Sequence, residues 1–199
     1  MNEKIRYKIA TLSQIIWWPT FWFIAYFIVR AEVEDNLSLP KDANARFIIA
    51  ANHQSKLDPF VITGIIKPRF WRRLLPYRYI TANQFLYSYL YIWLLWPLGG
   101  FPAYKTEREG WGLKHSELIH SMGQTLCIFP EGQRSKPNEI KPKHGLARIA
   151  SLPNTYVIPI NLQWYHNPRR VKVIIGSSYN ADGLSSDEIL KNIYNLSSK

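Results

Sequence analysis

Cysteine is almost absent from this chain, which has Cys127 alone among 199 residues. A single cysteine excludes any intrachain disulfide and fits a protein of a reducing compartment. The apolar neighbours of Cys127 indicate a small buried hydrophobe rather than a nucleophile. The chain also lacks internal repeats and low-complexity tracts, so we expect one folded domain with a core of its own.

Acidic residues are few: 14 Asp and Glu stand against 25 Lys and Arg, giving a formal net charge of +11 and a pI of about 9.8. Such an excess implies an acidic partner, either nucleic acid, an anionic membrane surface or an anionic substrate. Eight Trp, twelve Tyr and nine Phe favour the membrane, because Trp and Tyr rings suit the membrane–water interface. Nucleic-acid binding predicts a soluble protein, and an apolar segment near the N-terminus argues against it.

No apolar run reaches the ~20 residues that a comfortable membrane span needs. The most apolar segment, Ile15 to Val29, is interrupted by Pro19, and no Ala-x-Ala cleavage site of a signal peptide follows it. We expect residues 1–35 to form a membrane-associating segment, a helix or helical pair lying in one leaflet at the cytoplasmic face. A tilted single span and burial against the domain are the alternatives.

Strands and helices are predicted to alternate in residues 36–199. The expected strands are Arg46–Ala51, Tyr77–Ala82, Gly100–Tyr104, Thr125–Phe129, Tyr156–Gln163 and Val171–Gly176. The expected helices are Pro59–Ile66, Gln84–Leu95, Glu107–Met122, Gly145–Ser151 and one that follows Ser185. This alternation indicates an α/β fold with a single mixed sheet flanked by helices.

A histidine and an aspartate stand five positions apart in the stretch ANHQSKLDPF, as His53 and Asp58. On one straight helix their side chains would point about 140° apart, so a contact requires a loop. The preceding apolar run predicts a strand, and Asp58 before Pro59 is typical of a helix N-cap. In such a loop the carboxylate would orient the imidazole as a general base, acting on a hydroxyl that the substrate brings. A loop histidine and a capping aspartate without catalytic roles are the competing interpretation.

Two further stretches combine glycine with basic residues, as anion-binding turns do. In FPEGQRS, Arg134 can clamp a phosphate with its planar fork, Gly132 permits close backbone approach, and Glu131 can bond a polyol hydroxyl. In PLGGFPAYKTER, the glycines are followed by Lys105 and Arg108. The alternative for FPEGQRS is a turn with a surface salt bridge. The alternative for PLGGFPAYKTER is a solvated basic loop.

The apolar segment VIPI, Val157 to Ile160, has Pro159 inside a predicted strand. Proline cannot donate a ladder hydrogen bond, so we expect an edge strand or a bulge there. This segment indicates a structural role rather than a catalytic one.

Taken in chain order, these four segments resemble the motifs of the glycerolipid acyltransferase family, which contains the 1-acylglycerol-3-phosphate acyltransferases. The NHxxxxD motif is matched by Asn52, His53 and Asp58. The FPEGTRS motif is matched from Phe129 to Ser135, with Gln133 in place of threonine. The glycine-led turn has Lys105 where the family has arginine, and VIPI matches the fourth motif.

The resemblance implies direct acyl transfer without a metal or prosthetic group. His53, oriented by Asp58, would deprotonate the free hydroxyl of 1-acylglycerol 3-phosphate, which attacks an acyl-CoA or acyl-carrier-protein thioester and gives phosphatidic acid. The residues implied to hold the acceptor are Asn52, Lys105, Arg108, Glu131, Gly132, Arg134 and Ser135. Glycerol 3-phosphate or another lysolipid is the alternative acceptor, and a non-enzymatic membrane-binding protein is the alternative class.

A basic cluster also fits lipid substrates and an anionic membrane surface. It lies in the stretch KPRFWRRLLPYR and contains Lys67, Arg69, Arg72, Arg73 and Arg78. Anionic lysolipid and bilayer surface would both attract it, and recruitment of an acidic carrier protein is a further interpretation. The simpler interpretation of the cluster is a solvated charged face.

Overall fold

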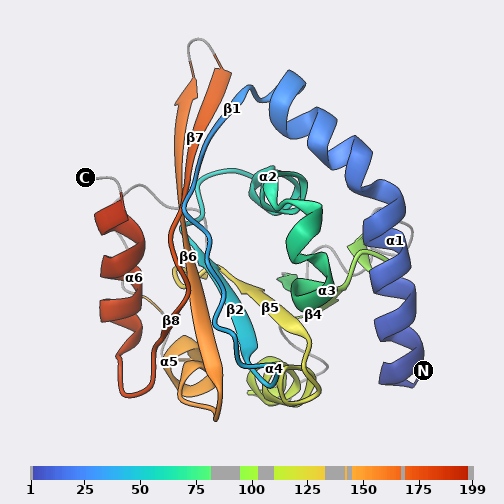
Figure 1. Cartoon of the computed structure of the whole chain (residues 1–199), viewed down its shortest axis with the longest axis vertical. Coiled ribbons are helices and arrows are strands. Elements are labelled where there is room, and N and C mark those ends of the chain that lie inside the picture. The colour runs from blue at the N-terminus through green and yellow to red at the C-terminus, as the bar shows by residue number, and fades with distance from the viewer. Residues whose placement is uncertain are drawn as a thin grey trace.

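A mixed sheet of eight strands forms the centre of the protein, with helices on both of its faces (Figure 1). The structure, a computed structural model, describes residues 2–81, 95–102, 110–132, 142, 145–166 and 169–196. The single sheet with parallel and antiparallel pairs confirms the predicted α/β fold with a single mixed sheet. The strands are β1 (Ala31–Asp35), β2 (Arg46–Ala51), β3 (Tyr77–Thr81), β4 (Gly100–Pro102), β5 (Thr125–Ile128), β6 (Thr155–His166), β7 (Arg169–Ile175) and β8 (Tyr179–Asn180).

The strand order is β1-β7-β6-β2-β5-β3-β4, and β8 also pairs with β6. β6 runs antiparallel to β7 and β8, whereas the other pairs are parallel. β2 lies between β5 and β6, with Ala50 beside Ile128 and Ala51 beside Ile160. The loop after β2 therefore opens beside the loop after β5 and the continuation of β6, at the edge where α/β sheets hold their ligands.

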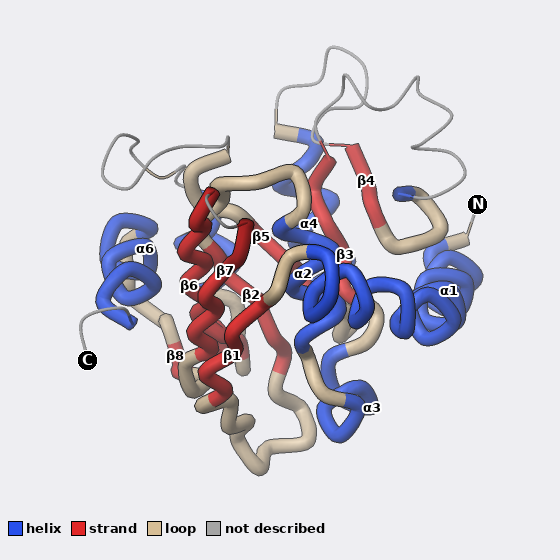
Figure 2. Tube along the Cα trace, turned by 90° about the horizontal axis from the view of Figure 1, so that it is seen from above, coloured by secondary structure: helices blue, strands red, loops and turns tan. Residues whose placement is uncertain are grey.

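Helices cover both faces of the sheet because successive strand residues point to opposite faces and both faces are apolar. Ile49 of β2 packs with Val61 and Ile62 of the next helix, whereas Ile48 faces the opposite core with Ile119. Figures 1 and 2 show α6 on the other side of the sheet from α1 and α2. The helices are α1 (Glu3–Phe23), α2 (Asp58–Ile65), α3 (Trp71–Leu74), α4 (Trp111–Ser121), α5 (Gly145–Ala150) and α6 (Ser186–Asn195), with a π-helical turn η1 (Ile24–Ile28) and a 3₁₀ turn η2 (Pro68–Phe70).

The N-terminal segment forms one helix that continues into η1 and rests on the domain. The buried side chain of Gln14 bonds the backbone N–H and C=O of Tyr77, at 2.9 and 2.8 Å, and the C=O of Leu98 at 2.7 Å. α1 approaches α2 so closely that a Cβ on Gly64 would lie 2.4 Å from the backbone oxygen of Phe21. One side of this helix is thus fixed to β3, to the segment before β4 and to α2.

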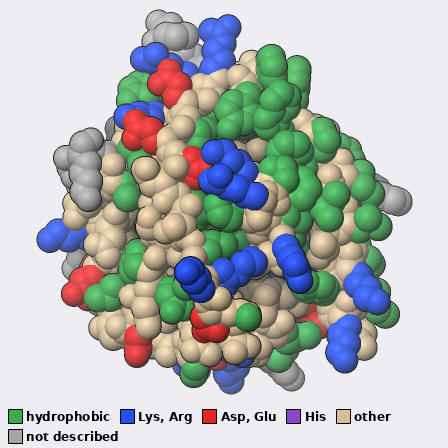
Figure 3. Space-filling view, in the orientation of Figure 1, with side chains coloured by type: hydrophobic (Ala, Val, Ile, Leu, Met, Phe, Trp, Pro, Cys, Tyr) green, Lys and Arg blue, Asp and Glu red, His purple; other side chains and the backbone are tan. Residues whose placement is uncertain are grey.

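The other side of the segment is apolar and exposed. Figure 3 shows hydrophobic side chains gathered over the side of the molecule where α1 runs. Its large exposed members are Ile5, Tyr7, Leu12, Ile15, Ile16, Trp17, Trp22, Phe23, Phe27 and Ile28. Among the described residues, none of the helices combines the length and apolar character needed to cross a bilayer. Association with a membrane stays a prediction.

The structure corrects one member of the predicted basic cluster. Arg78 has no exposed surface; its guanidinium donates to the C=O of Gly99 and to the side chain of Gln124, and it pairs with Glu3 at 3.4 Å. Lys67 and Arg69 are exposed and pair with Asp35, at 2.7 and 3.6 Å. Burial raises the pKa of Asp35, but the hydrogen bonds from Lys67 and the Leu37 N–H, together with the charges of Lys67 and Arg69, give a net lowering of that pKa. Arg78 therefore belongs to the interior rather than to a lipid-facing surface.

The position of Pro159 is a second correction, because β6 is an interior strand rather than an edge. Pro159 stands opposite Ala50 of β2, and its C=O accepts from the Gly176 N–H at 2.9 Å. The N and O of one strand residue point to the same side, so the missing N–H faces the gap between β8 and β7. Proline is tolerated there because no ladder bond is required of it.

Most other predicted elements are confirmed, with shifts at their ends. β2 has the predicted bounds, β6 continues to His166, and α4 begins at Trp111. The sequence predicted neither β1 nor β8, and β1 lies inside the segment assigned to residues 1–35. The helix expected at Gln84–Leu95 lies almost wholly outside the described residues.

Candidate active site

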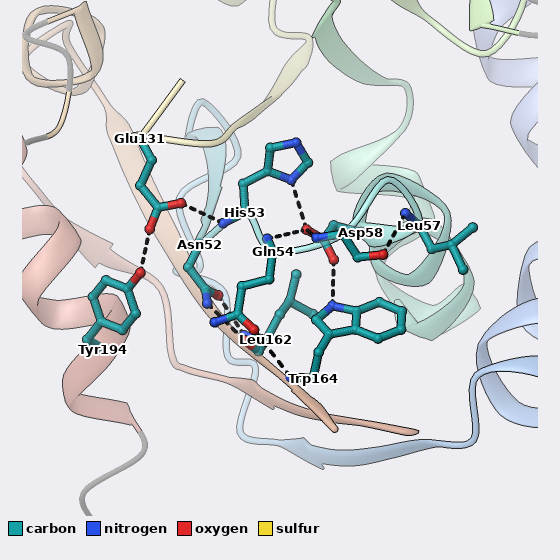
Figure 4. Close-up of polar contacts among 10 residues, drawn as sticks. Asn52, His53, Gln54, Leu57, Asp58, Glu131, Leu162, Trp164 and Tyr194 are labelled. Carbon is teal, nitrogen blue, oxygen red and sulfur yellow. Dashed lines mark hydrogen bonds and ion pairs between the residues drawn. The ribbon is translucent and has the colours of Figure 1, made fainter. Parts of the chain in front are cut away.

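His53 and Asp58 lie in contact at the carboxyl end of β2, in the geometry that their spacing predicted. Residues 52–57 form a loop between β2 and α2, and His53 Nδ1 lies 2.8 Å from Asp58 Oδ2 (Figure 4). The carboxylate is wholly buried, whereas 21% of the imidazole is exposed. A contact of this kind fixes the ring and leaves its far edge available to a substrate.

The carboxylate of Asp58 is held from several directions. Oδ2 also accepts from the backbone N–H groups of Gln54 and Ser55, each at 2.8 Å, and Oδ1 accepts from Trp164 Nε1 at 2.8 Å (Figure 4). The prediction that Asp58 caps its helix is wrong. Asp58 is the first helical residue, Leu57 is the N-cap, and the carboxylate turns back to the preceding loop.

The imidazole of His53 has a defined tautomer in this arrangement. Nδ1 faces Asp58 Oδ2, which already accepts two backbone N–H groups, so Nδ1 carries the hydrogen and donates it, which leaves a lone pair on Nε2. The ring stacks on Phe129, with centroids 4.2 Å apart and planes inclined by 25°. Nε2 is therefore a proton acceptor presented at the surface of the site, as a general base must be.

Glu131, from the FPEG stretch, reaches the same loop from the neighbouring strand. Glu131 is 3% exposed; Oε2 accepts the backbone N–H of His53 at 2.8 Å, and Oε1 accepts the hydroxyl of Tyr194. The loop after β5 is thereby tied to the histidine backbone on one side and to α6 on the other. The predicted bond from Glu131 to an acceptor hydroxyl stays a prediction.

Asn52 connects the loop to β6. It is wholly buried; its amide donates to the Leu162 C=O at 2.8 Å and accepts from the Leu162 N–H at 2.7 Å. This pair of bonds sets where the loop leaves the sheet, immediately before His53. A contact between Asn52 and substrate stays a prediction.

Gly132 ends the described part of the FPEG loop. It has a left-handed backbone, with φ of 68°, and its N–H donates to the Phe129 C=O at 3.0 Å. It is exposed, so its backbone can be approached closely. The other predicted acceptor ligands, Lys105, Arg108, Arg134 and Ser135, lie outside the described residues.

A protein-family model described as Acyltransferase matches residues 30–163. The chain belongs to the acyltransferase family. The matched span contains His53, Asp58 and Glu131, the three residues that the sheet brings together. Comparison with proteins of curated function gives no match.

The fold of this acyltransferase is similar to that of a solved relative. The crystal structure of PlsC, the 1-acyl-sn-glycerophosphate acyltransferase from Thermotoga maritima, matches with a TM-score of 0.65 and 20% sequence identity. The match covers 91% of this chain and 77% of that one. At this identity the likeness shows a shared fold.

Sequence reasoning missed two residues of the acyltransferase site, Trp164 and Tyr194. Both lie beyond the span that the family model matches. A signal existed for Trp164, because Ile158, Ile160 and Leu162 precede it at alternate positions and pack in the core beneath α2. Tyr194 gave no local signal, since its contact with Glu131 arises only when α6 packs against the sheet.

Proposed function

We propose that this acyltransferase transfers a fatty acyl group from an acyl thioester to the free hydroxyl of 1-acylglycerol 3-phosphate, giving phosphatidic acid. The observation that carries the proposal is the bond between His53 Nδ1 and the buried carboxylate of Asp58, which leaves Nε2 as the proton acceptor. The partial exposure of the His53 imidazole supports the proposal, because a hydroxyl brought by the acceptor could then approach it and no nucleophile of the protein is required.

The proposed reaction proceeds by direct attack. His53 Nε2 takes the hydrogen of the acceptor hydroxyl while the hydroxyl oxygen bonds to the thioester carbonyl carbon. The imidazolium is stabilised by Asp58, which stays ionised throughout. When the carbon–sulfur bond breaks, the sulfur leaves with the electron pair and takes the proton back from Nε2. The products are the new ester and the free thiol of the donor, and His53 is restored.

The donor is proposed to be acyl-CoA or acyl-carrier protein, with no further cofactor. Glu131 and Gly132 are proposed to bind the glycerol part of the acceptor, with Lys105, Arg108, Arg134 and Ser135 at its phosphate. The planar guanidinium of arginine matches phosphate oxygens better than a lysine ammonium does. Because position 105 is a lysine, glycerol 3-phosphate and other lysolipids should be compared with 1-acylglycerol 3-phosphate as acceptors.

We further propose that the enzyme works on a membrane surface at its cytoplasmic face. The exposed apolar side of α1 and η1 would enter the lipid headgroup region, because Trp and Phe side chains favour that depth. Exposed basic residues such as Lys67, Arg69 and Arg72 would add attraction to anionic lipids. A lipid acceptor would then reach His53 without leaving the bilayer.

The test is acyl transfer in mixed micelles, with labelled acyl-CoA and acyl-carrier protein as separate donors and 1-acylglycerol 3-phosphate as acceptor. We expect phosphatidic acid from the wild type and a loss of about 10²- to 10⁴-fold in His53→Ala. Lys114→Ala, an exposed substitution on α4, is the control and should keep full activity.

The outcomes separate the candidates. Product formed from glycerol 3-phosphate or another lysolipid in place of 1-acylglycerol 3-phosphate would replace the acceptor named here. Transfer that is equal in His53→Ala and wild type would overturn the base mechanism. No transfer from either donor to any acceptor, together with binding to lipid vesicles, would favour the non-enzymatic membrane-binding protein.

A further inference from the structure

We infer that Trp164 is a positioning residue for acyl transfer, holding Asp58 so that Asp58 can hold His53. This inference rests on the proposed function and concerns a residue outside the span that the family model matches. The indole Nε1 of Trp164 donates to Asp58 Oδ1 at 2.8 Å, on the oxygen that does not face the histidine (Figure 4).

The alternation of β6 explains why this side chain reaches the site. Successive strand residues point to opposite faces, so Trp164 follows Ile160 and Leu162 on the face that packs beneath α2. Its backbone is fixed by pairing with Val171 of β7. The indole is therefore presented from a paired strand rather than from a loop, and strands position side chains well.

The carboxylate of Asp58 needs this donor on physical grounds. It has no exposed surface, and a buried carboxylate oxygen left without a partner is costly. The imidazole and the N–H groups of Gln54 and Ser55 bond Oδ2. A donor on Oδ1 opposes rotation of the carboxylate about its Cβ–Cγ bond, which keeps Oδ2 directed at Nδ1.

Trp164 is also tied to the histidine loop through a closed ring of hydrogen bonds. The backbone N–H of Trp164 donates to Gln54 Oε1 at 3.3 Å, and the backbone N–H of Gln54 donates to Asp58 Oδ2. The indole N–H then returns from Trp164 to Asp58 Oδ1. Loop, carboxylate and strand thus fix one another, and the indole N–H closes the ring.

Two substitutions test the inference. Trp164→Phe keeps an aromatic ring in the core but has no N–H. Replacement of Trp164 by β-(3-benzothienyl)alanine keeps the bicyclic shape and removes only the donor, so it answers the question even if Trp164→Phe folds poorly. Trp111→Phe, in the core on the opposite face of the sheet, is the matched control.

Two readouts are required, one of which needs no substrate. The first is the low-field proton NMR signal of His53 Nδ1–H, assigned by its loss in His53→Gln, which reports the bond to Asp58 directly. The second is the separation of kcat from KM in acyl transfer to the micellar acceptor. A residue that acts only through folding would leave the NMR signal of the folded protein unmoved.

We expect both Trp164 variants to move or broaden the His53 signal and to lower kcat by about 10- to 100-fold, with the KM for the acceptor within about threefold of wild type. Trp111→Phe should change neither. An unmoved signal, or a kcat within twofold of wild type in the benzothienyl variant, would overturn the inference. If the wild type itself transfers no acyl group, the proposed function fails, and the NMR readout alone decides whether Trp164 positions the pair.

Discussion

Tyr194, near the end of α6, donates its hydroxyl hydrogen to Oε1 of Glu131, which lies 63 positions earlier in the loop after β5. The other oxygen of Glu131 accepts the backbone N–H of His53. Burial raises the pKa of Tyr194, and the adjacent Glu131 carboxylate raises it further, so the phenol keeps its hydrogen well above neutral pH. The last helix therefore helps to support the backbone of His53.

Tyr194→Phe should weaken this support. The substitution leaves a buried carboxylate oxygen without that donor, which costs about 1–3 kcal/mol of folding free energy. Urea unfolding measures this loss, and the acyl-transfer assay should show a lower kcat as the His53 backbone loosens. Tyr179→Phe is the control, because the Tyr179 hydroxyl only accepts a long bond of 3.4 Å from Asn192. Equal stability in the two variants would contradict the assignment.

Asp58→Asn should abolish most activity while preserving shape. The amide that replaces the carboxylate can donate to Nδ1, which would place the imidazole hydrogen on Nε2 and block proton acceptance there. By analogy with serine-protease triads we expect kcat to fall by about 10³- to 10⁴-fold. Asp182→Asn, on an exposed turn, should be unaffected. Activity of Asp58→Asn within tenfold of wild type would argue against an orienting carboxylate.

Gly64→Ala should separate α1 from α2. The new Cβ would lie 2.4 Å from the Phe21 oxygen, and because that atom is backbone the helices must move apart. We expect a loss of about 1–3 kcal/mol in unfolding free energy, although alanine is the better helix former. Gly145→Ala meets only the flexible end of Leu113 at 3.3 Å and should change stability by less than about 0.5 kcal/mol. Thermal unfolding that ranks the two variants in the reverse order would refute the close contact.

His120 should make the protein sensitive to acid. Burial, and secondarily the charge of Arg46, lower the pKa of His120 from 6.5 to about 4. The unfolded chain therefore takes up this proton first, so stability is full above pH 6.5 and falls as the pH drops toward 4. His120→Gln, which can still bond Thr155, should remove up to about 3 kcal/mol of this pH dependence. The free energy of unfolding is to be measured from pH 7 to pH 4 for the wild type and His120→Gln. An equal decrease in the two proteins would contradict the role assigned to His120.

The exposed side of the N-terminal segment should bind lipid. Phe23 and Phe27 are exposed and stack at 5.2 Å, so Phe23→Asp with Phe27→Asp places two charges where we propose contact with the bilayer. We expect at least tenfold weaker flotation with anionic vesicles, since charged side chains are costly in lipid. Leu118→Asp with Met122→Asp, an equally spaced exposed pair at the end of α4, is the control. Equal loss of binding in both double variants would oppose the proposed surface.

The contact between His53 and Asp58 was predictable because all its parts are local. An apolar strand, a six-residue loop and a proline at the start of a helix set where both residues lie. β1 was missed for the opposite reason: its residues were assigned to the membrane-associating segment, and its acidic side chains give no strand pattern. It forms a strand by pairing with β7, far along the chain, where Glu32 and Glu34 also meet Arg170 and Lys172. A polar edge strand of this kind has no strong local pattern.

The burial of Arg78 could not be predicted from the sequence for a similar reason. Arginine in a basic run is ordinarily solvated, and its burial depends on carbonyl and amide acceptors supplied by Gly99 and Gln124. Trp164 and Tyr194 depend likewise on segments that meet only in the folded sheet. Local patterns therefore predicted the contact between His53 and Asp58. The residues that support this contact required the tertiary structure.

The bond from Tyr194 to Glu131 also has a consequence for biosynthesis. During translation His53, Asp58 and Glu131 are made before α6, so all three are present in a nascent chain that still lacks the Tyr194 hydroxyl. Until α6 packs, the Glu131 carboxylate has no tyrosine donor and the histidine loop has one fewer anchor. A chain in which α6 has not yet packed would then carry the His53–Asp58 pair without its full support.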